Sequence, residues 1–356
     1  MSSSLANIPI IDIGADGVSE ASIGKALVDA AAEHGFIYIK NTGQVMAVDR
    51  IQKTFDISKT LFKETPLDEK KQCTIQTNNR GWSGMQSERL DPKNQKVGDF
   101  KEGFNFGEFK DGKADQPLPS TIVPFESDIK QFFNDCMSLS QWILYLLGIG
   151  LETQPADFFS SVHTPEKGES GTILRLLHYP APSEVPVEDD CVRAGAHSDY
   201  GSITLLFRLP GQAGLEILTR DNTWVPVPVV PAGTETDPCS PILVNIGDLL
   251  SYWTNGLFRS TLHRVTVPSN SSSVPVVNVE GERSGERYSI AFFCHPASDT
   301  RLEPVPSTRV TEFSGSVVSE DVNPYAQRQV MTAKEHLLMR LSATYKGLYE
   351  QIETSS

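Results

Sequence analysis

Two histidines and one aspartate stand at a spacing that suits a metal ion. His197 and Asp199 are two residues apart, and His263 follows in the segment Ser260-Thr-Leu-His-Arg-Val. Two imidazoles and one carboxylate can occupy one face of an octahedral ferrous ion, which leaves the opposite face for dioxygen and a further ligand. These three residues are therefore predicted to form a catalytic iron site.

The residues around His197 and Asp199 support this interpretation, because a His-x-Asp pair by itself could arise by chance. If residues 193–199 form a strand, its period of two places Arg193, Gly195, His197 and Asp199 on one face. Gly195 would leave this face open beside the metal, and Arg193 could bind substrate or be structural. His263 would come from another strand, and the lack of a third histidine in a zinc pattern favours iron. The other histidines are interpreted as structural: His34, His163, His178, His295 and His336.

A second group of residues could hold a carboxylate. Arg287 and Ser289 share one face of an expected strand over residues 287–293. A planar guanidinium beside a hydroxyl suits a bidentate grip on a carboxylate. Tyr179 could add a phenol to the same carboxylate, or could be a core aromatic whose hydroxyl is satisfied elsewhere.

The substrate contacts are harder to derive. Four phenylalanines are candidate pocket walls by position, with a core role as the alternative for each: Phe104, Phe106, Phe207 and Phe293. Trp82 and Arg89 lie in an irregular region where a lid or a solvated loop could form.

The first half of the chain is expected to be mixed α and β. A strand over 8–13 precedes a helix over 19–34, with Ser19 or Ser22 as its cap, and then a strand over 36–39. Helices are expected over 48–62 and from Pro66, an ordered loop region with short strands over 74–120, and a long helix over 127–147 stopped by Gly148 and Gly150.

The second half changes to short apolar or alternating runs separated by Pro and Gly. Eight strands are expected, over 173–179, 193–199, 203–208, 215–218, 223–227, 242–246, 264–267 and 287–293. Their spacing predicts a mainly β fold with flanking helices, either a sandwich or a double-sheet jelly roll. Surface loops are expected at 230–238 and 269–286, and a final helix over 327–350.

Composition limits the class of protein. The 356 residues include 31 Lys and Arg against 45 Asp and Glu, a net charge of −14 without a basic cluster, which disfavours nucleic acid as a partner. No apolar run is long enough for a membrane span, so a cytoplasmic location is expected. Five widely spaced cysteines argue against a disulfide framework. Oligomeric state cannot be read from these patterns.

The motifs together resemble the isopenicillin N synthase-like family of iron(II)- and 2-oxoglutarate-dependent dioxygenases, in a form typical of fungal members. The resemblance rests on five segments: Ile8-Pro-Ile-Ile-Asp-Ile, His34-Gly-Phe-Ile-Tyr-Ile-Lys-Asn, Lys101-Glu-Gly-Phe-Asn-Phe, Val244-Asn-Ile-Gly-Asp-Leu-Leu and Ser260-Thr-Leu-His-Arg-Val. One departure is Leu177-His-Tyr-Pro, where many plant members have Asn-Tyr-Tyr-Pro, so one asparagine contact to the cosubstrate is missing.

The resemblance implies a fold, a division of the chain and a reaction. The fold is a distorted double-stranded β-helix, with a helix-rich α/β region at 1–165, the catalytic jelly roll at 166–300 and a C-terminal tail at 301–356 whose helix packs on the core, all in one functional unit. His197, Asp199 and His263 would bind Fe(II). Arg287, Ser289 and Tyr179 would bind 2-oxoglutarate.

The implied activity is oxidation of a C–H bond in a small organic molecule with O2, plausibly in natural-product biosynthesis. Hydroxylation is the default outcome, with desaturation or ring rearrangement as variants. Two alternatives stay open at this point: an iron oxidase of the isopenicillin N synthase type that needs no 2-oxoglutarate, and a binding protein that keeps the barrel without catalysis.

Overall fold

Two β-sheets enclose the centre of the molecule. The computed structural model describes residues 5–184, 193–267, 285–313 and 330–344. The large sheet has the strand order β1-β2-β12-β9-β14-β7-β4-β3, and the small sheet has the order β11-β10-β13-β8. Side chains from both sheets pack together in one buried cluster that includes Leu177, Tyr179, Leu215, Val265 and Ala291. This arrangement confirms the predicted double-stranded β-helix.

The expected strands of the second half are all present, with small shifts at their ends. The large sheet contains β1 (Ile10–Ile11), β2 (Phe36–Ile39), β3 (Gly81–Ser83), β4 (Glu102–Phe106), β7 (Ile173–Tyr179), β9 (Ile203–Arg208), β12 (Ile242–Ile246) and β14 (Arg287–Cys294). The small sheet contains β8 (Ala194–His197), β10 (Leu215–Leu218), β11 (Trp224–Pro226) and β13 (His263–Val265), and β5 (Phe109–Lys110) pairs with β6 (Lys113–Ala114).

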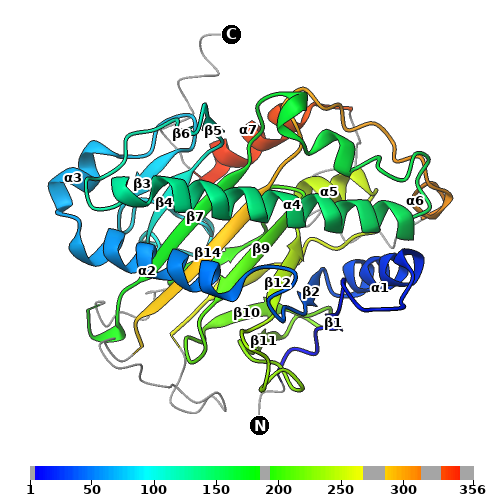
Figure 1. Cartoon of the computed structure of the whole chain (residues 1–356), viewed down its shortest axis with the longest axis horizontal. Helices are drawn as coiled ribbons and strands as arrows, with labels where there is room; N and C mark the ends of the chain where they lie inside the picture. The colour runs from blue at the N-terminus through cyan, green and yellow to red at the C-terminus, as the bar shows by residue number, and fades with distance from the viewer. Residues whose placement is uncertain (1–4, 185–192, 268–284, 314–329, 345–356) are drawn as a thin grey trace.

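Helices cover the outer face of the large sheet. The long helix α4 crosses this face with α2 beside it, as Figure 1 shows. The α-helices are α1 (Glu20–Glu33), α2 (Val48–Glu64), α3 (Leu67–Gln72), α4 (Glu126–Gly150), α5 (Asp248–Trp253), α6 (Thr308–Thr311) and α7 (Ala333–Thr344). The apolar sides of α1, α2 and α4 and the outer face of the sheet share the larger hydrophobic cluster. The helices therefore bury the outer face of the large sheet, and the inner face, which meets the small sheet, is available for the site.

The expected end of the long helix at Gly148 is wrong. Helix α4 continues through Gly148 to Gly150, because this glycine pair serves packing. A Cβ at Gly150 would lie 2.2 Å from the carbonyl oxygen of Gly24 on α1, and a Cβ at Gly24 would lie 2.5 Å from that of Leu146. At the start of α1, the Ser22 N–H donates to Ser19 Oγ over 3.2 Å, as the predicted cap requires.

The remaining expectations are met in part. Helix α7 begins at Ala333, later than the expected start near 327, and residues 345–350 lie outside the described part, as do 269–284 of the expected loop. The described cysteines Cys73, Cys136, Cys239 and Cys294 are free thiols, and Cys191 lies outside the described residues. Among the described helices, none has both the length and the apolar character needed to cross a membrane.

Candidate active site

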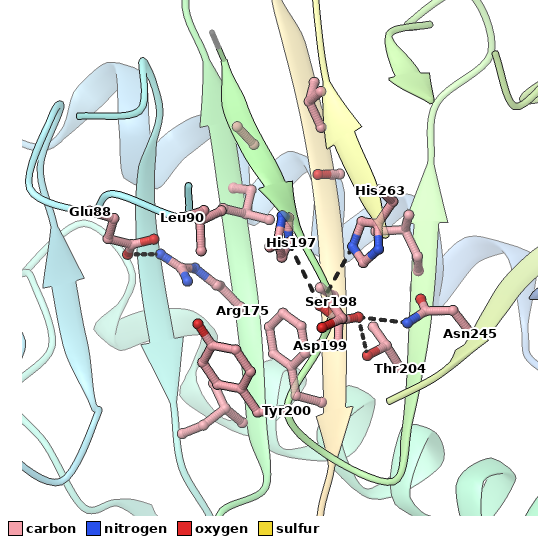
Figure 2. A pocket seen from close by; sticks show the side chains of 18 of the residues that line it. Glu88, Leu90, Arg175, His197, Ser198, Asp199, Tyr200, Thr204, Asn245 and His263 are labelled. Carbon is pink, nitrogen blue, oxygen red and sulfur yellow. Dashed lines mark hydrogen bonds and ion pairs between the residues drawn. The ribbon is translucent and has the colours of Figure 1, made fainter. Parts of the chain in front are cut away.

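The fold brings the three candidate metal ligands together at one end of the small sheet. His197 ends β8, Asp199 follows in the next turn, and His263 begins β13 directly opposite His197. The possible ligand atoms of the three residues all lie within 4.8 Å of one another. Asp199 Oδ1 is 3.8 Å from His197 Nε2 and 3.6 Å from His263 Nε2 (Figure 2).

Each histidine is oriented by a backbone carbonyl. His197 Nδ1 lies 2.7 Å from the carbonyl oxygen of Gly195, and His263 Nδ1 lies 3.1 Å from that of Thr261. A carbonyl only accepts a hydrogen bond, so each Nδ1 carries the proton and each Nε2 keeps its lone pair. Both lone pairs belong to the nitrogens closest to Asp199, as a metal site requires.

Asp199 is held through one of its two oxygens. Its Oδ2 accepts hydrogen bonds from Thr204 Oγ1 at 2.6 Å and from Asn245 Nδ2 at 2.7 Å. Oδ1 faces the histidines, as the dashed contacts in Figure 2 show. The carboxylate is therefore fixed as a one-oxygen ligand, and the Thr204 and Asn245 contacts, which come from different strands, have no local signal in the sequence.

The electrostatics favour the protonation states that a metal needs at His197 and Asp199, whereas at His263 a metal ion must compete with a proton. Burial and the neighbouring His263 lower the pKa of His197 to about 3, so this imidazole is neutral. Burial opposes ionisation of Asp199, but the two histidines and Thr204 bring its pKa well below the usual range. Burial also disfavours the charged form of His263, yet Asp199 raises its pKa. Two imidazoles and an ionised carboxylate fit a divalent ion such as iron(II).

The prediction that Arg193 and Gly195 face the metal is wrong, because β8 contains a bulge. His197 pairs with His263, but Val265 pairs with Ala194 instead of Gly195, so one extra residue interrupts the alternation. Gly195 is turned to the segment before β4, where its N–H donates to Asp99 Oδ1. Arg193 is buried and does not line the cavity.

Arg287 lines the other end of the same cavity. Arg287 Nη1 donates to Ser289 Oγ over 3.2 Å, and the Arg287 guanidinium lies 4.6 Å from the centre of the Tyr179 ring. Tyr179 and Arg287 are direct cross-strand partners. The structure therefore brings together the three residues that the sequence predicted for a carboxylate, and all three line the cavity.

Two further buried arginines lie near Arg287. Arg193 donates to the carbonyl oxygens of Pro180 and Gly285, and Arg208 donates to backbone carbonyls and to the Tyr38 hydroxyl. Burial and Arg287 lower the pKa of Arg193 to about 10. Within the described ranges, none of the three has a carboxylate within ion-pair distance. This end of the cavity therefore fits an anionic ligand.

The rest of the cavity has both polar and apolar walls. Arg175 on β7 pairs with Glu88, and Lys101 Nζ lies 3.2 Å from Glu88 Oε2. Phe293 on β14 and Leu337 on α7 are among the apolar lining residues. The empty space of the cavity, with its open mouth included, is about 1060 Å³.

Three of the predicted phenylalanine walls are wrong. Phe104 and Phe106 on β4 face the helices, and Lys101 and Asn105 on the opposite face line the cavity. Phe207 packs against Phe132 of α4, with ring centres 5.2 Å apart. Alternation predicts two faces for each strand, but it does not say which face meets the helices when both are buried.

The expected lid residues also have other roles. Trp82 Nε1 donates to Glu102 on the helix side of the sheet, and neither Trp82 nor Arg89 lines the cavity. Glu88 and Leu90 from the same segment do line it. His178, interpreted as structural, lies on the helix side between the carboxylates of Glu102 and Glu286, and His295 lines the cavity.

Two family models match the chain. The model described as the N-terminal region of non-haem dioxygenases in morphine synthesis matches residues 8–124. The model of the 2OG-Fe(II) oxygenase superfamily matches residues 171–296, which include all the proposed metal and carboxylate ligands.

Individual relatives extend over most of the chain. A UPF0676 protein of Schizosaccharomyces pombe is 34% identical over 84% of each chain, and the proline hydroxylase buaE of Petromyces alliaceus is 31% identical over 93% of this chain and 96% of its own. The structure of a full-length Neurospora crassa protein in complex with alpha-KG and thymine superposes with a TM-score of 0.73. It is 27% identical and covers 96% of this chain and 99% of that one.

Proposed function

The chain belongs to the 2OG-Fe(II) oxygenase superfamily as a non-haem iron(II)- and 2-oxoglutarate-dependent dioxygenase with a small-molecule substrate, and from this premise we propose which residues act and what they act on. His197, Asp199 and His263 hold iron(II). Arg287, Ser289 and Tyr179 hold the distal carboxylate of 2-oxoglutarate. The reaction is oxidation of a substrate C–H bond, with hydroxylation as the default.

One observation carries this assignment: a donor set for a divalent cation lies at one end of the cavity, and Arg287 lines the other end. The buried Arg193 and Arg208 lie near Arg287, and none of the three has a carboxylate partner in the described structure. Iron(II) and 2-oxoglutarate, when bound, supply the oxidising chemistry, in which one oxygen atom of O2 enters the substrate and the other enters succinate as CO2 leaves. The protein residues bind, orient and shield the reactants.

Each part of the cavity has a separate task. The carbonyl contacts at Nδ1 keep both imidazoles in the ligating tautomer, and Thr204 and Asn245 keep Asp199 Oδ1 directed at the ion. Arg287 and Ser289 fix the far end of the cosubstrate, while Arg193 and Arg208 add positive potential behind them. The metal ligands have little exposure, which limits access of water to the reacting atoms.

The walls support a small substrate that has both polar and apolar parts. Asn105 is 2% exposed, its Oδ1 has no hydrogen-bond partner within the described part of the chain, and it can accept from a substrate N–H or O–H. The Neurospora crassa structure holds thymine, a small polar ring, and the fungal relatives include a proline hydroxylase and a 2-oxoglutarate-dependent dioxygenase. We therefore propose a small heterocyclic or amino-acid-derived substrate, with natural-product biosynthesis as the setting. A cytoplasmic location stays a prediction.

The test is iron-dependent turnover of 2-oxoglutarate. Without oxygen, 2-oxoglutarate added to the iron(II) protein is expected to give a visible metal-to-ligand absorption band. With oxygen and a panel of pyrimidines, amino acids and cyclic amides, succinate formation is expected to rise when a substrate is present. An absence of both the band and succinate in the wild-type protein would contradict the proposal.

Variants separate the two ends of the cavity. Asp199→Ala is expected to abolish the band by removing the metal. Arg287→Met should keep metal binding but weaken 2-oxoglutarate binding by roughly 10- to 100-fold, since a hydrogen bond to a charged group contributes about 1.5–3 kcal/mol. Arg301→Met, at a side chain that is 64% exposed, is the control. Unchanged 2-oxoglutarate affinity in Arg287→Met would show that Arg287 does not hold the cosubstrate and would leave it free to bind a substrate carboxylate.

A further inference from the structure

Helix α7 turns one side toward the cavity and the metal ligands. Its core-facing positions follow the i, i+3, i+4, i+7, i+8 pattern of an amphipathic helix. They are Ala333, His336, Leu337, Arg340 and Leu341, of which both leucines line the cavity. Arg340 lies on this core-facing side, where its guanidinium loses part of its hydration. A charged group in such a position requires a hydrogen-bonding partner of opposite charge.

Arg340 has its partners directly behind the metal ligands. Its Nη2 lies 2.8 Å from Asp248 Oδ2 and donates to Ser198 Oγ over 3.4 Å. Its guanidinium also lies over the Tyr200 ring, 4.9 Å from the ring centre. Ser198 is the residue between His197 and Asp199, so α7 is bonded to the segment that carries two of the three ligands.

The Asp248 carboxylate joins this segment to the third ligand. Asp248 Oδ2 accepts from Ser198 Oγ at 3.0 Å, and Oδ1 accepts from Ser260 Oγ at 2.6 Å, three residues before His263. The Asp248 N–H also donates to the carbonyl oxygen of Asp199 over 2.7 Å. One buried side chain thus contacts both ligand segments and the helix that forms a wall of the cavity.

We propose that Arg340 is a positioning residue that couples the docking of α7 to the geometry of the metal-ligand segments. The proposal rests on the proposed function, because it takes His197, Asp199 and His263 as the metal ligands. Metal binding orders those segments, which favours the docked helix and so completes the apolar wall formed by Leu337 and Leu341. Linkage is reciprocal: the factor by which metal binding strengthens the docking of α7 is also the factor by which docked α7 strengthens metal binding. Loss of the Arg340 bond should therefore weaken metal binding by that factor.

Hydrogen exchange of the α7 amides tests this coupling, with Mn(II) plus 2-oxoglutarate as a redox-stable probe. In the wild-type protein the probe is expected to slow exchange in α7 by roughly tenfold, within the usual range of coupling between sites. In Arg340→Met the probe should change exchange in α7 less than twofold, and Mn(II) affinity should fall by roughly the same tenfold factor. Arg340→Lys, which keeps a charge for Asp248, should restore part of both effects.

The controls distinguish coupling from simple anchoring and from failure of the proposed function. Lys334→Met removes a charge from an exposed position of the same helix and should leave the probe-dependent change intact. If Arg340 only anchors α7, Arg340→Met will speed exchange equally with and without the probe, and the inference is overturned. A wild-type protein that binds no Mn(II) contradicts the proposed function instead, whereas one that binds it without any change in α7 contradicts only the coupling.

Discussion

The Asp199 carboxylate is aligned by two neutral donors. Thr204 and Asn245 both donate to Oδ2, from strands β9 and β12 of the large sheet, although Asp199 itself follows a strand of the small sheet. The direction of the ligating oxygen therefore depends on how the two sheets are held together. Without these donors the carboxylate could rotate and offer both oxygens, or neither, to the ion.

We expect Asn245→Ala and Thr204→Val to weaken metal binding by roughly 10- to 100-fold, the usual effect of removing a contact that orients a ligand. The measurement is Mn(II) or iron(II) titration at constant pH. Thr54→Val, at an equally buried threonine on α2, is the control and should leave metal affinity unchanged. Equal metal affinities in all these proteins would show that Asp199 is oriented by other means.

The individual site residues were predictable where spacing alone defines the chemistry. The two histidines and Asp199 meet as expected, because a His-x-Asp pair and a histidine on another strand need only two adjacent strands to converge. Arg193 could not be placed, because a bulge in β8 reverses its direction and leaves no mark in local composition. Leu337 was missed because a cavity wall formed by a helix 140 residues after His197 depends on the tertiary fold.

Strands β4, β7 and β14 are joined to the helices through His178. Its imidazole lies between the Phe62 and Tyr288 rings, with its two nitrogens 3.1 Å from Glu102 Oε1 and 2.8 Å from Glu286 Oε1. Burial disfavours the charged imidazole, but hydrogen bonds to both carboxylates raise its pKa above the ordinary value. His178 precedes Tyr179 and Glu286 precedes Arg287, so this contact lies directly behind the proposed cosubstrate site.

The raised pKa of His178 predicts a pH-dependent contribution to stability. The charged form stabilises the fold fully below the unfolded pKa of about 6.5, and this contribution is lost as pH rises through the folded pKa. His178→Gln should therefore lower the free energy of unfolding more at pH 6 than at pH 9, by roughly 1 kcal/mol for each unit of pKa shift. Denaturant unfolding at both values measures this, and Glu286→Gln should reduce the difference. A pH-independent effect of His178→Gln would contradict the charge assignment.

The crossing of α1 and α4 depends on Gly24 and Gly150 at their closest approach. In an ordinary helix Gly→Ala stabilises by about 1 kcal/mol. Gly24→Ala should instead destabilise by about 1–3 kcal/mol, because the new methyl group would overlap the backbone of α4. Thermal unfolding measures the sign, and Ala26→Gly at an exposed site on α1 gives the ordinary propensity for comparison. A more stable Gly24→Ala protein would show that the helices can separate without cost.

The elements themselves were largely predictable, and their packing was not. Strands β7, β9, β10 and β12 have the expected bounds, because each is a short apolar run ended by Gly, Pro or a polar turn. Gly148 was expected to end α4, because a glycine near a helix end has the same sequence signature whether it stops the helix or allows close contact. For Gly148 the close neighbour is the backbone of Ala156, whose carbonyl oxygen would lie 2.1 Å from an added Cβ, and only the folded chain shows this contact.

The N-terminal part and the jelly roll share one sheet. Strands β1 to β4 belong to the eight-stranded sheet that also contains β7, β9, β12 and β14. Within it, β2 pairs with β12 and β4 pairs with β7, so hydrogen-bond ladders join residues before and after 165. We therefore propose that the expected boundary near 165 separates regions of one cooperative unit, with α7 docked on the same unit through Arg340.

If the molecule is one unit, ligands at the centre should stabilise all of it. Mn(II) and 2-oxoglutarate contact both sheets in the proposed site, and ligand at 100 times its Kd adds about 2.7 kcal/mol to the folded state. We expect a single thermal transition that rises by roughly 5–10 °C, since about 1 kcal/mol shifts a domain of this size by 2–4 °C. Calorimetry measures the whole chain, while tryptophan fluorescence reports on both sides of residue 165, because Trp82 and Trp142 precede it and Trp224 and Trp253 follow it. Asp199→Ala should keep one transition but lose the shift. Two transitions, of which only one responds to ligand, would mean that the shared sheet does not make the N-terminal region and the jelly roll unfold together.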